Sequence, residues 1–149
     1  MRGVPSRTDM KKIFWMAGLA AVVCAFLFRP SFLRAEGAVE GYPSLSPAEA
    51  RDLLGKRSGD PGFVLLDVRT PKEFDAERIE GAVMVDYNSP SFREETAKLD
   101  RNKTYLVYCR TGHRTDGSLK VMRDLGFRNV SALEGGITKW KEAGFPTAR

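Results

Sequence analysis

The residues with the clearest potential for chemistry follow one another from Cys109 to Thr115, with the sequence CRTGHRT. A cysteine followed by two arginines, Arg110 and Arg114, is typical of a reactive thiol, because the guanidinium charges stabilise the thiolate. Gly112 permits the positive φ angle that a tight loop needs. We therefore expect Cys109 to act as a covalent nucleophile and the loop that follows it to bind an anionic substrate.

The other residues of this loop are expected to contact that substrate. His113 is the only histidine in the chain, and two roles stay open for it: a base for Cys109, or an exposed residue that contacts substrate. One cysteine and one histidine fall short of a metal ligand set, so we predict no metal site. The predicted catalytic residue is Cys109, and the predicted substrate-binding residues are Arg110, Thr111, Gly112, His113, Arg114 and Thr115.

Short strands and helices must position this loop, and the hydrophobic pattern predicts them. Apolar runs of strand length alternate with helical patterns, which predicts the α/β class, with an open, mostly parallel central sheet and helices on both faces. In such sheets ligands bind beyond the carboxyl ends of the strands, and Cys109 ends the third apolar run. Strands are predicted over 63–68, 82–85, 104–108 and 129–133, and helices from Pro47 and Pro71 and over 89–99, 115–125 and 136–143.

Two local patterns support these boundaries. Ser46 with Glu49, and Thr70 with Glu73, each form a capping box followed by proline at the first helical position, which predicts where two helices begin. Glu73 is thus interpreted as a cap for its own helix. Asp67 and Arg69, just after a buried strand, are predicted to form an ion pair that ties loops together.

Composition and charge restrict the class of protein. The chain has 149 residues, 42% hydrophobic and 29% charged, which suits one globular domain with a short segment attached. Six of the 24 basic residues and one of the 19 acidic residues lie in residues 1–35, which leaves 18 of each in the rest. The net charge of +5 therefore belongs to the amino-terminal segment, and we predict no nucleic-acid partner.

That segment has the pattern of an export signal: basic residues, an apolar run over 13–28, then Arg29 and Pro30. Sixteen residues of helix span about 24 Å, less than the ~30 Å hydrocarbon core, so cleavage is favoured over an uncleaved anchor. Lipidation of Cys24 is a weaker third option.

We predict a signal peptide or anchor over 1–35, a linker over 36–43 and a domain over 44–149, in a protein that is periplasmic or anchored facing the periplasm. Met1 and Met10 are both candidate starts, and contact with a membrane is expected only through 13–28.

Three segments together resemble a known family. They run from Leu66 to Ala82, from Tyr108 to Thr115, and from Gly126 to Trp140. Over Leu45 to Pro146 the chain resembles single-domain rhodaneses, and in particular the small exported rhodaneses of bacteria. The resemblance implies the rhodanese-like α/β fold, and we expect the protein to be a monomer.

The resemblance implies a sulfurtransferase in which Cys109 takes sulfane sulfur from a donor such as thiosulfate or polysulfide, holds it as a persulfide and passes it to cyanide or a thiol. It implies no metal or organic cofactor. The chain departs from the family pattern at Arg78, where histidine is frequent, and at Asp116 and Gly117, where small alanine-like residues are more usual.

Two alternatives stay open. A sulfur-carrying or protein-binding module that does not turn over would have the same loop. A phosphatase or arsenate reductase would need arginine six positions after the cysteine, whereas Arg114 lies five positions after Cys109 and Thr115 lies at six. A redox thiol is less favoured, because there is no resolving cysteine nearby.

Overall fold

The computed structural model describes residues 41–149. The predicted export segment, its cleavage or anchoring, and the linker as far as residue 40 lie outside the described residues. Tyr42, at the end of the predicted linker, is only 6% exposed, and its hydroxyl donates to the Phe127 carbonyl. The packed domain therefore already includes Tyr42.

Five strands form one sheet in the order β1-β5-β4-β2-β3, and every neighbouring pair is parallel. The prediction of an open, mostly parallel sheet is confirmed. The shortest strands lie at the two edges, and sequence analysis missed β1 because a strand of two residues carries no periodicity. The strands are β1 (Ser44–Leu45), β2 (Phe63–Asp67), β3 (Val83–Met84), β4 (Thr104–Tyr108) and β5 (Val130–Leu133).

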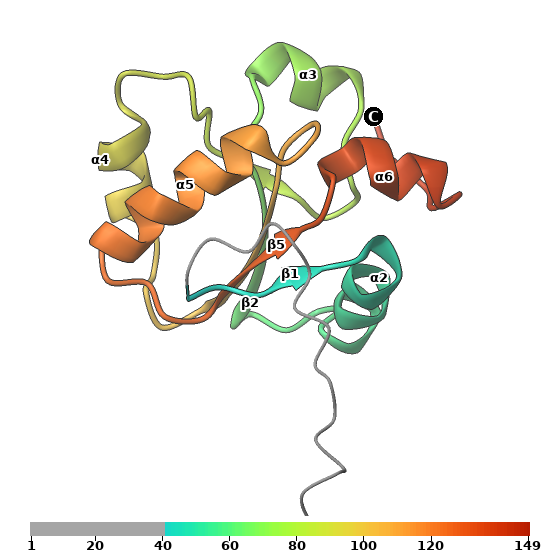
Figure 1. Cartoon of the computed structure of the whole chain (residues 1–149), viewed down its shortest axis with the longest axis horizontal. Helices are drawn as coiled ribbons and strands as arrows, with labels where there is room; N and C mark the ends of the chain where they lie inside the picture. The colour runs from blue at the N-terminus through green and yellow to red at the C-terminus, as the bar shows by residue number, and fades with distance from the viewer. Residues whose placement is uncertain (1–40) are drawn as a thin grey trace, which may run out of the picture. The chain divides into compact units, whose positions relative to one another are not determined.

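Five helices connect these strands, and both predicted capping boxes are present. Ser46 and Thr70 each accept from the backbone N–H three residues on, while the glutamate at that position accepts from the cap's own N–H. The helices are α2 (Pro47–Lys56), α3 (Pro71–Ala76), α4 (Phe92–Ala97), α5 (His113–Asp124) and α6 (Gly136–Glu142). Figure 1 labels all five.

Helix α5 begins at His113, two residues before the predicted start at Thr115. Gly112 has φ 109° and turns the chain, and the Asp116 N–H already donates to the Gly112 carbonyl at 3.0 Å. The loop after Cys109 is therefore shorter than predicted, and His113 and Arg114 lie in the first turn of the helix.

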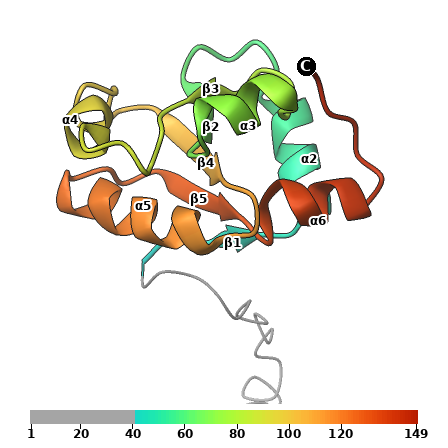
Figure 2. The same cartoon turned by 90° about the horizontal axis from the view of Figure 1, so that it is seen from above.

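The sheet separates two hydrophobic clusters, as the alternation of residues along β4 shows. Val107 and Cys109 lie in one cluster with Phe92 of α4 and Leu119 of α5, and Leu106 and Tyr108 lie in the other with α2 and α6. Helices therefore cover both faces, as predicted. Both views show α4 and α5 towards one end of the domain and α2 and α6 towards the other (Figures 1 and 2).

Within residues 41–149, no helix combines the length and the apolar character that crossing a bilayer requires.

Candidate active site

Cys109 lies directly after β4, at the carboxyl edge of the sheet and between the neighbouring strands β2 and β5. Its side chain is only 1% exposed, and the Gly112 N–H points at Sγ with a nitrogen–sulfur distance of 3.1 Å. A backbone N–H aimed at the sulfur, at the start of a 12-residue helix, favours negative charge on that atom.

The loop after Cys109 is held from behind by the first turn of α6. The Ile137 N–H donates to the Cys109 carbonyl at 2.9 Å, and the Thr138 N–H donates to the Arg110 carbonyl at 3.1 Å. These two donors belong to the helix start, where backbone N–H groups have no partner within the helix. Because a trans peptide points its C=O and N–H in opposite directions, the N–H groups of Arg110 and Thr111 face away from α6.

Gly136 allows this close approach. A Cβ atom built on it would lie 2.3 Å from the Cys109 carbonyl oxygen and 2.7 Å from the Arg110 carbonyl oxygen, and its φ is +59°. Gly136 is the first residue of α6, after the turn from β5, and sequence analysis missed its contact with the loop. Only the fold brings residue 136 against residue 109.

Arg114 is engaged by a carboxylate from another helix. Its Nη1 and Nη2 donate to the two oxygens of Glu73 in α3, at 2.7 and 2.8 Å. Donation from Arg114 lowers the pKa of Glu73 to about 2, with a further contribution from Thr70, and the same contact raises the pKa of Arg114. Sequence analysis assigned Glu73 only to its capping box; the carboxylate performs both roles, because Oε2 also accepts from the Thr70 N–H.

The predicted ion pair between Asp67 and Arg69 is confirmed. Both residues are almost fully buried, at 0% and 4% exposed, and Arg69 donates through Nε and Nη2 to the Asp67 carboxylate. Nη2 also donates to the Glu77 carbonyl at 2.7 Å. The pair thus ties the end of β2 to the end of α3, the helix that carries Glu73.

The other predicted substrate-binding residues differ in exposure. Arg110, Thr111 and His113 are exposed, and the guanidinium of Arg110 has no ion-pair or hydrogen-bond partner among residues 41–149. Thr115 is 1% exposed, and its Oγ1 has no hydrogen-bond partner in the described part of the chain. Arg110 is therefore the cation of this loop that can meet an anion from solvent.

Gly117, one of the departures from the family pattern, makes room for an aromatic side chain. A Cβ atom on Gly117 would lie 2.1 Å from the hydroxyl oxygen of Tyr87. Tyr87 is half-buried, and it packs against the cluster that contains Cys109. The lack of a side chain at Gly117 therefore leaves room for the Tyr87 ring, and the methyl group of an alanine at this position would overlap with that ring.

No group of three or more metal-ligating side chains comes together within the range 41–149. The arrangement around Cys109 consists of a buried sulfur, a backbone donor, a fixed loop and one accessible guanidinium. Such a site suits covalent chemistry on an anionic substrate through the sulfur itself.

Known proteins resemble this chain over the same region. A family model described as a rhodanese-like domain matches residues 46–143. The probable adenylyltransferase/sulfurtransferase MoeZ of Mycobacterium tuberculosis is 35% identical over 99 residues, which are 65% of this chain and 24% of that protein. The chain thus spans about a quarter of that relative's length.

Two further relatives each match 72% of this chain. The thiosulfate sulfurtransferase GlpE of Coxiella burnetii is 32% identical over 107 residues, which cover 72% of this chain and 94% of that one. The crystal structure of a rhodanese-related protein from Thermoplasma volcanium has a TM-score of 0.62 and 29% identity, and the match covers 72% of this chain and 98% of that chain.

Proposed function

The chain belongs to the rhodanese-like family, and from this premise we propose that it is a sulfurtransferase with Cys109 as its nucleophile. The observation that carries the proposal is the 3.1 Å contact from the Gly112 N–H to the Cys109 sulfur, in a loop whose carbonyls are held by α6. The arrangement prepares the loop for an anionic sulfur before any substrate binds.

In the first step the Cys109 thiolate attacks the outer sulfur of thiosulfate. A bond forms between Sγ and that sulfur, the bond between the two thiosulfate sulfurs breaks, and its electron pair leaves with sulfite. The product is an anionic persulfide on Cys109. The exposed guanidinium of Arg110 is the group suited to meet the incoming anion, because Arg114 is occupied by Glu73.

In the second step a thiolate or cyanide attacks the outer sulfur of the persulfide, and Cys109 leaves as a thiolate. The covalent intermediate divides the transfer into two displacements, so the mechanism requires no metal and no organic cofactor. Polysulfide is a second donor that fits the same chemistry.

The position of Arg114 separates this proposal from a phosphatase or arsenate reductase. Those enzymes have a Cys-x5-Arg motif, in which the arginine binds the oxyanion. In this chain Arg114 comes one residue earlier, and its Nη1 and Nη2 both donate hydrogen bonds to the Glu73 carboxylate. The remaining alternative is a carrier that exchanges sulfur only with a partner protein. Turnover with small donors distinguishes it from an enzyme.

The test is intact-mass analysis of the reduced full chain after thiosulfate and then after cyanide, with thiocyanate measured in the supernatant. We expect a gain of one sulfur atom that cyanide removes. The Cys109→Ser variant should gain none, and Cys24→Ser is the matched control that should load normally. Loading that persists in Cys109→Ser would refute the assignment; a folded, reduced native protein that neither loads nor releases thiocyanate would favour the carrier.

We also propose that residues 1–35 export the protein, which would place the domain in the periplasm, free or anchored. Cell fractionation of the producing bacterium, with amino-terminal sequencing of the recovered protein, tests this. A product found only in the cytoplasm with its amino terminus intact would refute export.

A further inference from the structure

Tyr87 lies at the same edge of the sheet as Cys109, two strands away. The last residue pair between β2 and β4 is Asp67 with Tyr108. The next residues of the two strands, Val68 and Cys109, are therefore opposite one another. The Tyr87 N–H donates to the Val68 carbonyl at 3.3 Å. Because neighbouring strands lie about 4.8 Å apart, the backbone of Tyr87 is about 10 Å from that of Cys109.

The Tyr87 side chain extends on the side of the sheet that carries the Cys109 sulfur. Cys109 and Val68 belong to one hydrophobic cluster, and Tyr87 packs against it. Its ring meets Phe92, the first residue of α4, edge to face with the centroids 5.2 Å apart. The end of the ring reaches α5 at Gly117, where a Cβ atom would lie 2.1 Å from the hydroxyl oxygen. Contacts with α4 and α5 thus fix the position of the ring before any substrate binds.

The hydroxyl at the end of this ring has no hydrogen-bond partner among residues 41–149. The other three tyrosines of the chain each use the hydroxyl in a hydrogen bond with the backbone: Tyr42, Tyr105 and Tyr108. In the same range, the unpartnered hydroxyls that are sealed from solvent are those of Thr96 and Thr115, so the hydroxyl of Tyr87 is open to solvent. A donor that is fixed, accessible and unpartnered is available to a ligand.

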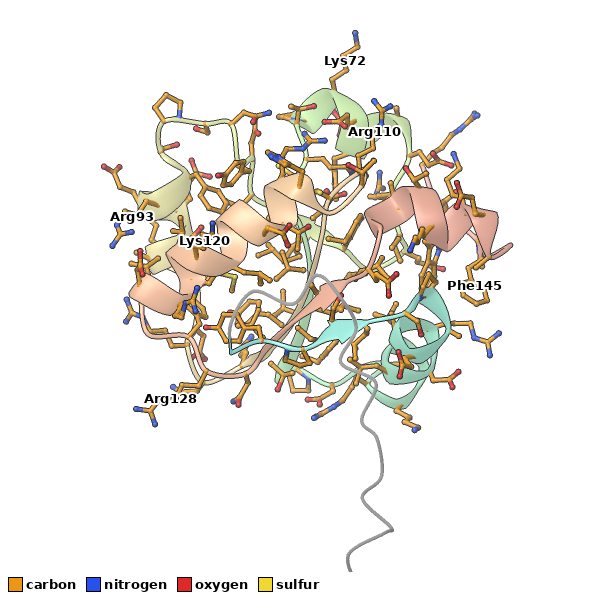
Figure 3. The ribbon with its side chains drawn as sticks, viewed as in Figure 1. Lys72, Arg93, Arg110, Lys120, Arg128 and Phe145 are labelled. Atoms are coloured by element: carbon orange, nitrogen blue, oxygen red, sulfur yellow. The ribbon has the colours of Figure 1, made fainter. Side chains whose placement is uncertain are left out.

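An anionic donor meets one free guanidinium at the loop before α5. Figure 3 shows Arg110 at this loop, and its guanidinium has no partner in the described part of the chain. Arg114 is neutralised by Glu73, and it lies three residues before Gly117, on the same face of α5. Thiosulfate carries two negative charges and three sulfonate oxygens, so one guanidinium leaves oxygens without a donor. The Tyr87 hydroxyl, about one helical turn from Arg114, is placed to supply another donor.

We infer that the Tyr87 hydroxyl binds the sulfonate group of thiosulfate, which makes Tyr87 a further substrate-binding residue of the Cys109 site. The inference rests on the proposed sulfurtransferase function. As Sγ bonds to the outer sulfur of thiosulfate, the bond between the two thiosulfate sulfurs breaks, and its electron pair moves onto the leaving sulfite. An O–H donor at the sulfonate oxygens stabilises this charge as it develops. Gly117 contributes by leaving room for the ring that carries the donor.

The test compares reactants that carry sulfonate or sulfite oxygens with reactants that lack them. On the reduced full chain, rate constants are measured for loading from thiosulfate and from inorganic polysulfide, and for unloading by sulfite and by cyanide, with the sulfur on Cys109 followed by intact mass. The variant is Tyr87→Phe, which removes the hydroxyl and keeps the ring. Tyr105→Phe is the matched control: Tyr105 belongs to the same cluster and meets Phe127 edge to face, but its hydroxyl donates to the Asp100 carbonyl, near the amino end of β4.

We expect Tyr87→Phe to slow loading from thiosulfate by about tenfold or more, the effect of one hydrogen bond to a charged group. Unloading by sulfite is the same reaction in reverse and passes through the same transition state, so it should slow by a similar factor. Loading from polysulfide and unloading by cyanide should stay unchanged, because neither reactant brings these oxygens. Tyr105→Phe should change none of the four rates.

Equal slowing of all four rates in Tyr87→Phe, or loading from thiosulfate at the native rate, would overturn the inference while leaving the sulfurtransferase function in place. Slowing by the same factor in Tyr105→Phe would also overturn it, because the effect would then come from packing of the cluster. A native chain that loads from polysulfide alone would overturn it as well, since no sulfonate would bind. If Cys109 takes up sulfur from neither donor, the proposed function fails, and this inference fails with it.

Discussion

Replacing Glu73 with glutamine tests whether the contact between α3 and α5 stabilises the domain. The substitution keeps the size of the side chain and removes the charge that Arg114 meets at 2.7 and 2.8 Å. The side chains of Arg114 and Glu73 are 19% and 29% exposed, so Arg114 would stay partly buried without an anion. Loss of a partly buried, bidentate pair is more costly than loss of a surface pair.

The magnitude follows from the pKa of Glu73, which falls from 4.5 to about 2 chiefly because Arg114 donates to the carboxylate. At about 1.4 kcal/mol per pKa unit, this corresponds to an upper bound of roughly 3.5 kcal/mol at neutral pH. Screening by solvent at a partly exposed pair reduces the figure, and we expect Glu73→Gln to lower the free energy of unfolding by about 1–2 kcal/mol.

The pH dependence of this contribution has a defined sign. Because the folded pKa of Glu73 lies below its unfolded value, the stabilisation is complete above about pH 5 and is lost as the pH falls towards 2. The difference in unfolding free energy between native protein and Glu73→Gln should therefore be largest at pH 7 and should shrink steadily between pH 5 and pH 3.

The assay is urea unfolding followed by circular dichroism at several pH values. Glu49→Gln is the matched control, because Glu49 occupies the same capping-box position in α2 and its side chain hydrogen-bonds only Ser46 among the described residues. A loss in Glu73→Gln no greater than in Glu49→Gln, or a loss that does not change between pH 7 and pH 3, would refute the reasoning.

Two glycine substitutions test the packing around the loop. Gly136→Ala should lower the free energy of unfolding, measured by urea unfolding, by at least about 2 kcal/mol more than Gly144→Ala does. Both positions have positive φ, but only at Gly136 would the new Cβ meet backbone, at 2.3 Å from the Cys109 carbonyl oxygen. Equal losses of stability in the two variants would contradict the packing argument. Gly117→Ala should destabilise by about 1–3 kcal/mol through overlap with Tyr87. In a Tyr87→Ala background, Gly117→Ala should instead stabilise the domain by up to ~1 kcal/mol, because alanine is a better helix former than glycine. If thermal melting of the four variants shows that Gly117→Ala destabilises both backgrounds, the overlap with Tyr87 does not explain the glycine.

Much of the scaffold could be predicted from the sequence, because local interactions determine it. The capping boxes of α2 and α3 join residues three apart, and the apolar runs of β2 and β4 are long enough to identify buried strands. The prediction missed β1, because a strand of two residues shows no hydrophobic pattern, and it placed the start of α5 two residues late, because the turn at Gly112 determines that boundary. The ion pair of Asp67 and Arg69 was also predictable, since its members lie only two positions apart in the sequence.

The sequence by itself determined the α/β class, the position of the Cys109 loop after a buried strand, and the residues that could take part in its chemistry, because these follow from neighbours along the chain. Only the tertiary structure decided how those residues are used. It brings Glu73 to Arg114, Gly136 to Cys109 and Tyr87 to Gly117. Each of these contacts joins different elements, and its geometry depends on the order of the strands and on how the helices pack, which no local pattern encodes.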